Sequence, residues 1–190
     1  TMKEMAKIDL FKTPVTVTEL DVSTSKLKSF CKIYKNKNIT KSNSGGYHSE
    51  FLDITVEPLK SLFKLIDAEV YKYSTNLLNL KEVFFDNAWY IVNPPKAYNK
   101  IHSHPHSTIS GAFYIDVPKN SGDIVFYNPN DVEPYLYRES INKFNDYNAS
   151  KYMLPCKEKN LIIFPAWLKH EVLQNMSKKN RKVLSFNYKC

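Results

Sequence analysis

The second half of the chain is a succession of short apolar runs, and this feature most limits its possible folds. After about residue 80, runs rich in β-branched and aromatic residues alternate with Pro, Gly, Asn and Ser, the usual turn residues. The runs are EVFFDNAWYIV, STISGAFYIDV, DIVFY, NLIIFP, HEVLQ and KVLSFNY. Short strands at such intervals are typical of an all-β sandwich or barrel. We therefore predict an antiparallel double-sheet β-roll, mainly β with helices packed outside.

The first 80 residues carry the expected helices. The run TPVTVTEL (13–20) alternates like a strand, and SNSGGYHS (42–49) reads as a loop. Two segments have apolar residues at helical spacing, one from Ser25 and one opened by Glu57-Pro58. Their apolar residues are Leu27, Phe30, Cys31 and Tyr34 in the first and Leu59, Leu62, Phe63, Ile66 and Tyr73 in the second.

One long segment, 128–155, is too polar and irregular for a core strand, and we interpret it as an insertion or lid. At 190 residues and 43% hydrophobic content, the chain is long enough for a single domain. We expect residues 1–80 to supply a strand and supporting helices, and residues 81–190 to form the β-roll core.

Net charge, hydropathy and cysteine content indicate which partners and which cellular compartment to expect. The formal net charge is +8, but the lysines are spread along the chain without a nucleic-acid-binding motif, so nucleic acid is an unsupported partner. No apolar run approaches the ~18 residues of a transmembrane helix, and the charged start of the sequence does not resemble a signal peptide. Three scattered cysteines favour a reducing cytoplasm.

Three of the five histidines, His102, His104 and His106, occupy alternate positions just before an apolar run. On a strand they would point to one side, where neutral imidazoles crowd together unless a metal binds them. A polar strand end near solvent explains the same pattern equally well. Further along, His170 stands at a strand entrance and converges with the pair if the sheet closes. Arg181 opens the last strand, where it either grips a carboxylate or lies in solvent.

Taken in order, His102-x-His104, SGAFYI, SGDIVFYNP, LIIFPAWLKHEV and RKVLSFNY resemble the iron(II)/2-oxoglutarate-dependent oxygenases. The nearest branch contains small bacterial and phage members related to prolyl hydroxylases. The resemblance spans roughly residues 40 to 189, and it implies a double-stranded β-helix, or jelly roll. It also implies a hydroxylase that uses Fe(II), O2 and 2-oxoglutarate, and releases succinate and CO2. A phage-encoded member would work in the host cytoplasm.

Residue by residue, the resemblance implies that His102 and His170 are metal ligands. It further implies that Arg181 pairs with the far carboxylate of 2-oxoglutarate. Ser185 shares the Arg181 face by strand alternation, and Tyr114 matches a cosubstrate-binding tyrosine or is a core aromatic.

The sequence departs from the family at His104, where most members carry Asp or Glu. His104 itself, a water molecule, or a carboxylate from elsewhere would complete the metal site. Asp116 is distant along the chain and Glu171 would point away from the His170 side, so we favour His104. His106 is a spare that could replace either neighbour.

Two other hypotheses are a cupin-like three-histidine dioxygenase or metal-binding protein that does not use 2-oxoglutarate, and a non-enzymatic basic binding module. The prime substrate, either a protein side chain or a small molecule, is not readable. We expect segment 128–155 and the loop around Gly45-Gly46 to form its pocket. The oligomeric state, a homodimer included, is left open.

Overall fold

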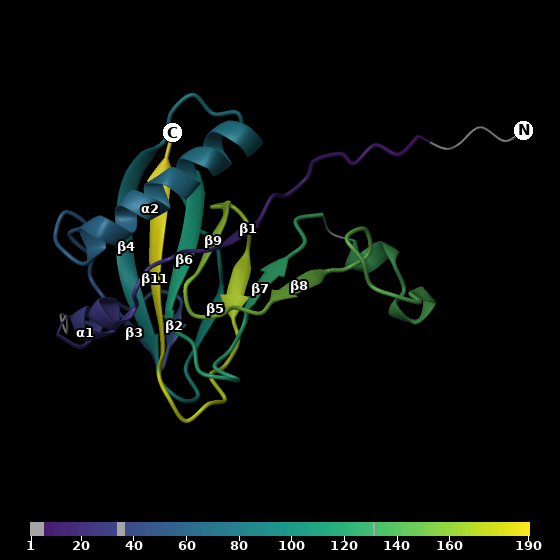
Figure 1. Cartoon of the computed structure of the whole chain (residues 1–190). Helices are drawn as coiled ribbons and strands as arrows, with labels where there is room; N and C mark the ends of the chain where they lie inside the picture. The colour runs from purple at the N-terminus through teal and green to yellow at the C-terminus, as the bar shows by residue number, and fades with distance from the viewer. Residues whose placement is uncertain (1–5, 34–36, 131) are drawn as a thin grey trace, which may run out of the picture.

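The computed structural model describes residues 6–33, 37–130 and 132–190. In these residues two antiparallel sheets face each other, one of six strands and one of five (Figure 1). The larger sheet has the order β1 (Thr16–Glu19), β9 (Asn160–Pro165), β6 (Ile109–Asp116), β11 (Arg181–Lys189), β4 (Phe84–Asn93), β3 (Tyr47–His48). The smaller sheet has the order β2 (Asn43–Ser44), β5 (Tyr98–His102), β10 (His170–Val172), β7 (Ile124–Tyr127), β8 (Lys151–Leu154).

Both expected helices form on the outer face of the larger sheet. Helix α1 spans Ser25–Ile33, and α2 spans Leu59–Lys72 and continues as a π-helical turn, η1 (Tyr73–Leu77). Figure 1 shows α2 lying across β4, β11 and β6. Tyr34, expected in the first helix, lies outside the described residues. The predicted mainly β fold with helices packed outside is confirmed.

Strand alternation divides the larger sheet into two faces with different tasks. On β11, Leu184 and Phe186 join the core beneath the helices, together with Phe113 of β6 and Phe63 and Ile66 of α2. The residues between them point the other way, toward the smaller sheet. Because successive side chains of a strand alternate, the same strands that bury the core also line the space between the sheets.

Two segments differ from the expectation. Segment 42–49 contains the two-residue strands β2 and β3 instead of a simple loop, and these pair with β5 and β4 in different sheets. Segment 128–155 holds two 3-10 turns, η2 (Glu133–Tyr135) and η3 (Arg138–Ser140), before β8 pairs with β7. The described residues between β7 and β8 extend away from the two sheets (Figure 1).

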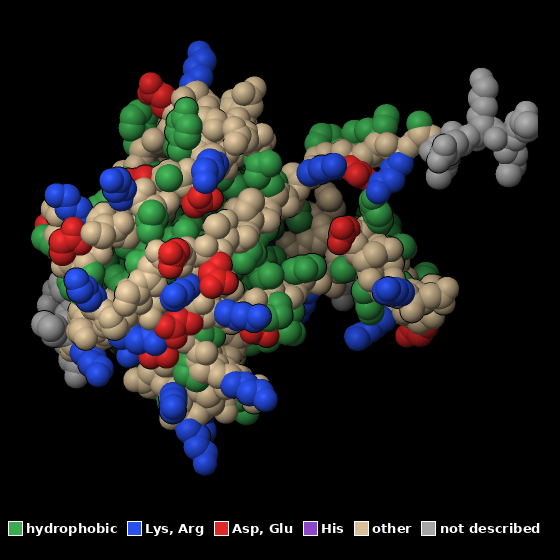
Figure 2. Space-filling view, in the orientation of Figure 1, with side chains coloured by type: hydrophobic (Ala, Val, Ile, Leu, Met, Phe, Trp, Pro, Cys, Tyr) green, Lys and Arg blue, Asp and Glu red, His purple; other side chains and the backbone are tan. Residues whose placement is uncertain are grey.

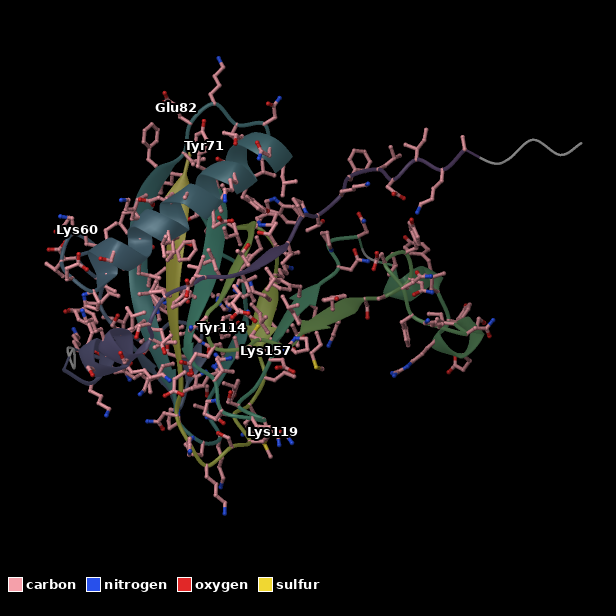
Figure 3. The ribbon with its side chains drawn as sticks, viewed as in Figure 1. Lys60, Tyr71, Glu82, Tyr114, Lys119 and Lys157 are labelled. Carbon is pink, nitrogen blue, oxygen red and sulfur yellow. The ribbon has the colours of Figure 1, made fainter. Side chains whose placement is uncertain are left out.

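The surface shows how the positive charge is distributed. On the visible face, Lys and Arg side chains are dispersed with Asp and Glu between them and form no continuous patch (Figure 2). Figure 3 shows Lys60 and Tyr71 on the outside of α2, whereas Tyr114 lies inside among the strands. Among the helices that the structure describes, none is long and apolar enough to cross a membrane.

Candidate functional site

Two of the candidate histidines meet because of the strand register in the smaller sheet. Strand β10 pairs antiparallel with β5, and in that register His170 lies directly opposite His102. Directly opposed residues bring their side chains close together, and the ring centroids are 4.3 Å apart. A single cross-strand pair therefore brings together two histidines that are far apart in the sequence.

His104 joins this pair from a turn, because β5 ends at His102. The three histidines therefore do not alternate along one strand, although His102 and His104 still lie close together. Pro105 has no N–H and cannot continue a strand ladder, and the chain turns back instead. The backbone N–H of His104 donates to the carbonyl of Ala166 at 2.9 Å, which fixes the turn against the segment before β10. His104 lies 5.2 Å from His102 and 5.1 Å from His170, between ring centroids.

The spare histidine, His106, does not take part. It has a left-handed φ of 68° and is exposed, outside the cluster formed by the other three. The candidate ligand atoms of His102, His104 and His170 all lie within 4.8 Å of one another. Three ring nitrogens this close could bind one metal ion, and non-haem iron sites with three protein ligands on one face leave other coordination positions open.

Each of the three imidazoles has its Nδ1 engaged by an oxygen. Nδ1 of His102 lies 2.7 Å from the carbonyl of Lys100, and that of His170 lies 2.9 Å from the carbonyl of Leu168. A backbone carbonyl only accepts hydrogen bonds, so in both rings Nδ1 carries the proton and Nε2 keeps a free lone pair. In His104 the Nδ1 lies 2.7 Å from Oδ1 of Asn187.

Burial keeps these imidazoles neutral. Desolvation lowers the pKa of His104 to about 4 and the pKa of His170 to about 3. It also lowers the pKa of His102. Desolvation disfavours the charged form of a buried histidine. At neutral pH the cluster thus offers three uncharged nitrogen donors, the form that binds a metal.

No carboxylate among the described residues completes the cluster. Asp116 faces Lys182 at 3.6 Å, at the far end of β6. The Glu171 carboxylate accepts a hydrogen bond of 2.6 Å from the Tyr127 hydroxyl. With both carboxylates engaged elsewhere, the structure brings His104, and neither acid, to the other two histidines.

A cavity of about 540 Å³ opens between the sheets and contains all three histidines in its wall. Asn187, Ser185, Val183 and Arg181 follow one another along the cavity side of β11. Asn187 contacts His104, so Arg181 lies toward the other end of the cavity. The predicted cosubstrate residues Arg181, Ser185 and Tyr114 therefore lie in the same cavity as the histidines.

Arg181 is buried without a counter-ion. Its exposed fraction is 2%, Nη1 donates to the Gly122 carbonyl at 2.9 Å, and Nε has no partner. No described carboxylate lies within ion-pair distance of it, although burial of an unpaired charge is costly. Tyr114 lies nearby, and burial raises the pKa of its hydroxyl well above the ordinary value, so the hydroxyl stays a neutral donor. The guanidinium is thus available for an anionic ligand.

The sequence reading missed other residues of the cavity wall. His48 and Trp89 stack at 5.3 Å between centroids with 9° between their planes, and Phe51 lies 6.4 Å from Trp89. The indole Nε1 is buried without a partner. The alternation of Asn87, Trp89 and Ile91 along β4 was the available signal for Trp89, since all three line the cavity.

The two segments predicted to form the substrate pocket differ in how they relate to this cavity. Ser42 and His48, which flank Gly45-Gly46, line the cavity, as expected for that loop. No described residue of 128–155 lines it, and the described residues between β7 and β8 extend outward. The part that the insertion plays in binding the prime substrate stays a prediction.

Comparison with known proteins agrees with this geometry. Residues 87–187, more than half of the chain, match the family model described as "Putative 2OG-Fe(II) oxygenase". No curated protein matches the chain.

The fold is similar to several solved oxygenase structures. A Pseudomonas putida prolyl-4-hydroxylase has a TM-score of 0.68 and 13% identity, with 96% of each chain covered. A viral collagen prolyl hydroxylase from Paramecium Bursaria Chlorella virus-1, in complex with 2OG, has a TM-score of 0.60 and 11% identity over 92% of this chain and 94% of that one. HygX from Streptomyces hygroscopicus, with nickel and 2-oxoglutarate bound, has a TM-score of 0.62 and 9% identity over 93% and 83%. The predicted double-stranded β-helix is confirmed.

Proposed function

Because the chain belongs to the 2OG-Fe(II) oxygenase family, and is an iron(II)- and 2-oxoglutarate-dependent oxygenase, we propose how its own residues divide that work. His102, His104 and His170 bind the iron. Arg181 binds the distal carboxylate of 2-oxoglutarate, with the hydroxyls of Ser185 and Tyr114 as additional donors. A substrate C–H group then approaches from the side of the cavity lined by Trp89 and His48.

The observation that supports this proposal most strongly is that one cavity contains both a cluster of possible metal ligands and a buried cation without an ion-pair partner. Three neutral imidazoles lie close together, and the buried Arg181 guanidinium, which makes no ion pair, lines the same cavity. A small dicarboxylate that chelates a metal with one end and meets Arg181 with the other satisfies both. The planar guanidinium fork matches the two oxygens of a carboxylate.

Iron(II), 2-oxoglutarate and O2 together supply the oxidising power that hydroxylates a substrate, with release of succinate and CO2. His102, His104 and His170 would hold the iron through three nitrogen ligands, and its remaining positions would stay open to ligands. Because all three are neutral, they leave both positive charges of the ion uncompensated, and the dianionic cosubstrate balances them. The apolar walls from Phe164 and Ile91 limit water in the cavity and strengthen these electrostatic contacts.

For the prime substrate we propose a protein side chain or small molecule that contacts the Trp89, His48 and Phe51 rings. The indole Nε1 offers an unpaired donor, and the stacked rings offer an aromatic wall. Both features suit a substrate that has an apolar body and one acceptor group.

Anaerobic titration with Fe(II) and 2-oxoglutarate tests the proposal through the metal-to-cosubstrate charge-transfer absorption. We expect the band in the wild-type protein and its loss in His170→Ala. A matched control is His106→Ala, which removes an exposed histidine outside the cluster and keeps the band. A wild-type protein that binds Fe(II) but gives no band would instead support a three-histidine metal protein without 2-oxoglutarate.

A further inference from the structure

His104 differs from the other two cluster histidines in what holds its ring. Its Nδ1 faces Oδ1 of Asn187 at 2.7 Å and Oγ of Ser110 at 3.0 Å, whereas His102 and His170 face backbone carbonyls. A carbonyl accepts only, but a side-chain amide can turn by half a rotation and present its NH2 group instead. Something must therefore fix the Asn187 amide before the tautomer of His104 is defined.

A chain of hydrogen bonds leads from that amide to a carboxylate. Nδ2 of Asn187 donates to Oδ1 of Asn87 at 2.9 Å, and Nδ2 of Asn87 donates to Oδ2 of Asp86 at 2.7 Å. Oδ1 of Asp86 in turn lies 2.7 Å from the Lys189 ammonium. The chain crosses from β11 to β4, where Asn187 and Asn87 are register partners, and ends at the edge of the cavity.

The Asp86 carboxylate fixes which group donates and which accepts in each hydrogen bond between Asp86 and His104. An ionised Asp86 can only accept, so Asn87 must turn its NH2 group toward Asp86 and its oxygen toward Asn187. Asn187 must then turn its NH2 group toward Asn87 and its oxygen toward His104. The Ser110 hydroxyl donates to the same oxygen at 2.7 Å. The imidazole is left with one consistent state, in which Nδ1 carries the proton and Nε2 has the free lone pair.

We propose that Asp86 is a positioning residue for His104, and that it acts through Asn87 and Asn187 to hold the imidazole in the Nδ1–H tautomer. This inference rests on the proposed function only where it concerns iron. A carboxylate ligand has no tautomer to control. A histidine in its place needs such control, and the chain from Asp86 provides it. Partners of this kind usually change metal affinity by about 10- to 100-fold.

The sharpest test is Asp86→Asn, which keeps the size of the side chain but reverses the donor–acceptor direction of the hydrogen bonds that lead to His104. The Lys189 ammonium holds the amide oxygen of residue 86, so its NH2 group faces Asn87 and both asparagines turn over. His104 then faces an NH2 group and shifts to the Nε2–H tautomer. We expect long-range 1H–15N correlation spectra of the metal-free protein at pH 7 to show this shift. Fe(II) affinity should fall by about 10- to 100-fold.

A second variant, which moves the carboxylate from position 86 to position 187, should restore the tautomer. In the double variant Asp86→Asn/Asn187→Asp, the new carboxylate accepts from His104 on one side and from the turned Asn87 on the other. We expect the Nδ1–H tautomer and most of the Fe(II) affinity to return. The control is Lys189→Met, which breaks the ion pair and keeps the Asp86 acceptor, so it should leave the tautomer unchanged.

Two results would overturn the proposal. One is Nε2–H in wild-type His104, and the other is an Asp86→Asn protein with unchanged tautomer and affinity. Failure of the proposed function looks different. In that case the wild-type protein shows Nδ1–H and the variants shift it as described, but Fe(II) binds to none of them.

Discussion

Arg181→Met replaces a buried guanidinium by an apolar side chain of similar length. In the wild-type protein the charge has one hydrogen bond, to Gly122, and an Nε without a partner. Loss of one member of a buried, hydrogen-bonded charge pair costs about 2–5 kcal/mol of binding free energy. We therefore expect the Kd for 2-oxoglutarate to rise by roughly 30- to 5,000-fold.

The stability of the cosubstrate-free protein should respond in the opposite sense. Burial of a charge that makes no ion pair is costly, and the hydrogen bond to the Gly122 carbonyl offsets only part of that cost, so replacement by an apolar group of similar volume should be neutral or stabilising. We expect chemical denaturation without 2-oxoglutarate to show an unchanged or higher free energy of unfolding for Arg181→Met. An arginine that served the fold alone would give a large loss instead.

The assay is an anaerobic titration of the Fe(II)-loaded protein with 2-oxoglutarate, followed by charge-transfer absorption and by calorimetry. Lys182→Met is the matched control, because it removes one positive charge from the neighbouring position, where Lys182 pairs with Asp116 at 3.6 Å outside the cavity. Its Kd should stay near the wild-type value. Wild-type affinity in Arg181→Met would refute the role of the guanidinium.

Three further predictions concern the histidines and the sheet. His102→Ala and His170→Ala should each lose iron, measured as bound metal after desalting, and full occupancy in either variant refutes its ligand role. In the metal-free protein, the lowered pKa values of His104 and His170 mean that unfolding takes up two protons below the unfolded pKa of about 6.5. Stability should thus fall as pH drops from about 5.5 to 4.5, by roughly 3 kcal/mol, because each proton taken up on unfolding contributes about 1.36 kcal/mol per pH unit; a flat denaturation profile there contradicts it. Gly111→Ala should destabilise by about 1–3 kcal/mol or more, because a Cβ would lie 2.2 Å from Cζ of Phe186; a wild-type melting temperature would show that the two strands are less tightly packed.

The local sequence pattern was enough to predict most of the strands and which side chains share a face of a strand. The apolar runs after residue 80 became β4, β6, β7, β9, β10 and β11, since their period of two suits a sheet with two covered faces. The same period put Arg181 and Ser185 on one side of β11, where both line the cavity. The single-domain division and the roles of the site residues stay predictions.

The sequence failed where an element depends on its partner. The two-residue strands β2 and β3 have no signal of their own, because they exist only by pairing with β5 and β4. The position of His104 also depends on a partner. Pro105 ends the ladder, and only the contact with the Ala166 carbonyl fixes where His104 lies afterwards.

By itself, the sequence determined the β-roll, the helices on its outer face, and the residue types that a metal and a dicarboxylate require. Only the tertiary structure decided which of these residues meet. The His102–His170 pair depends on the β5–β10 register, and the Asp86 chain to His104 depends on the register of β11 with β4. Register is set by long-range pairing and by burial of whole faces, and a local pattern does not encode it.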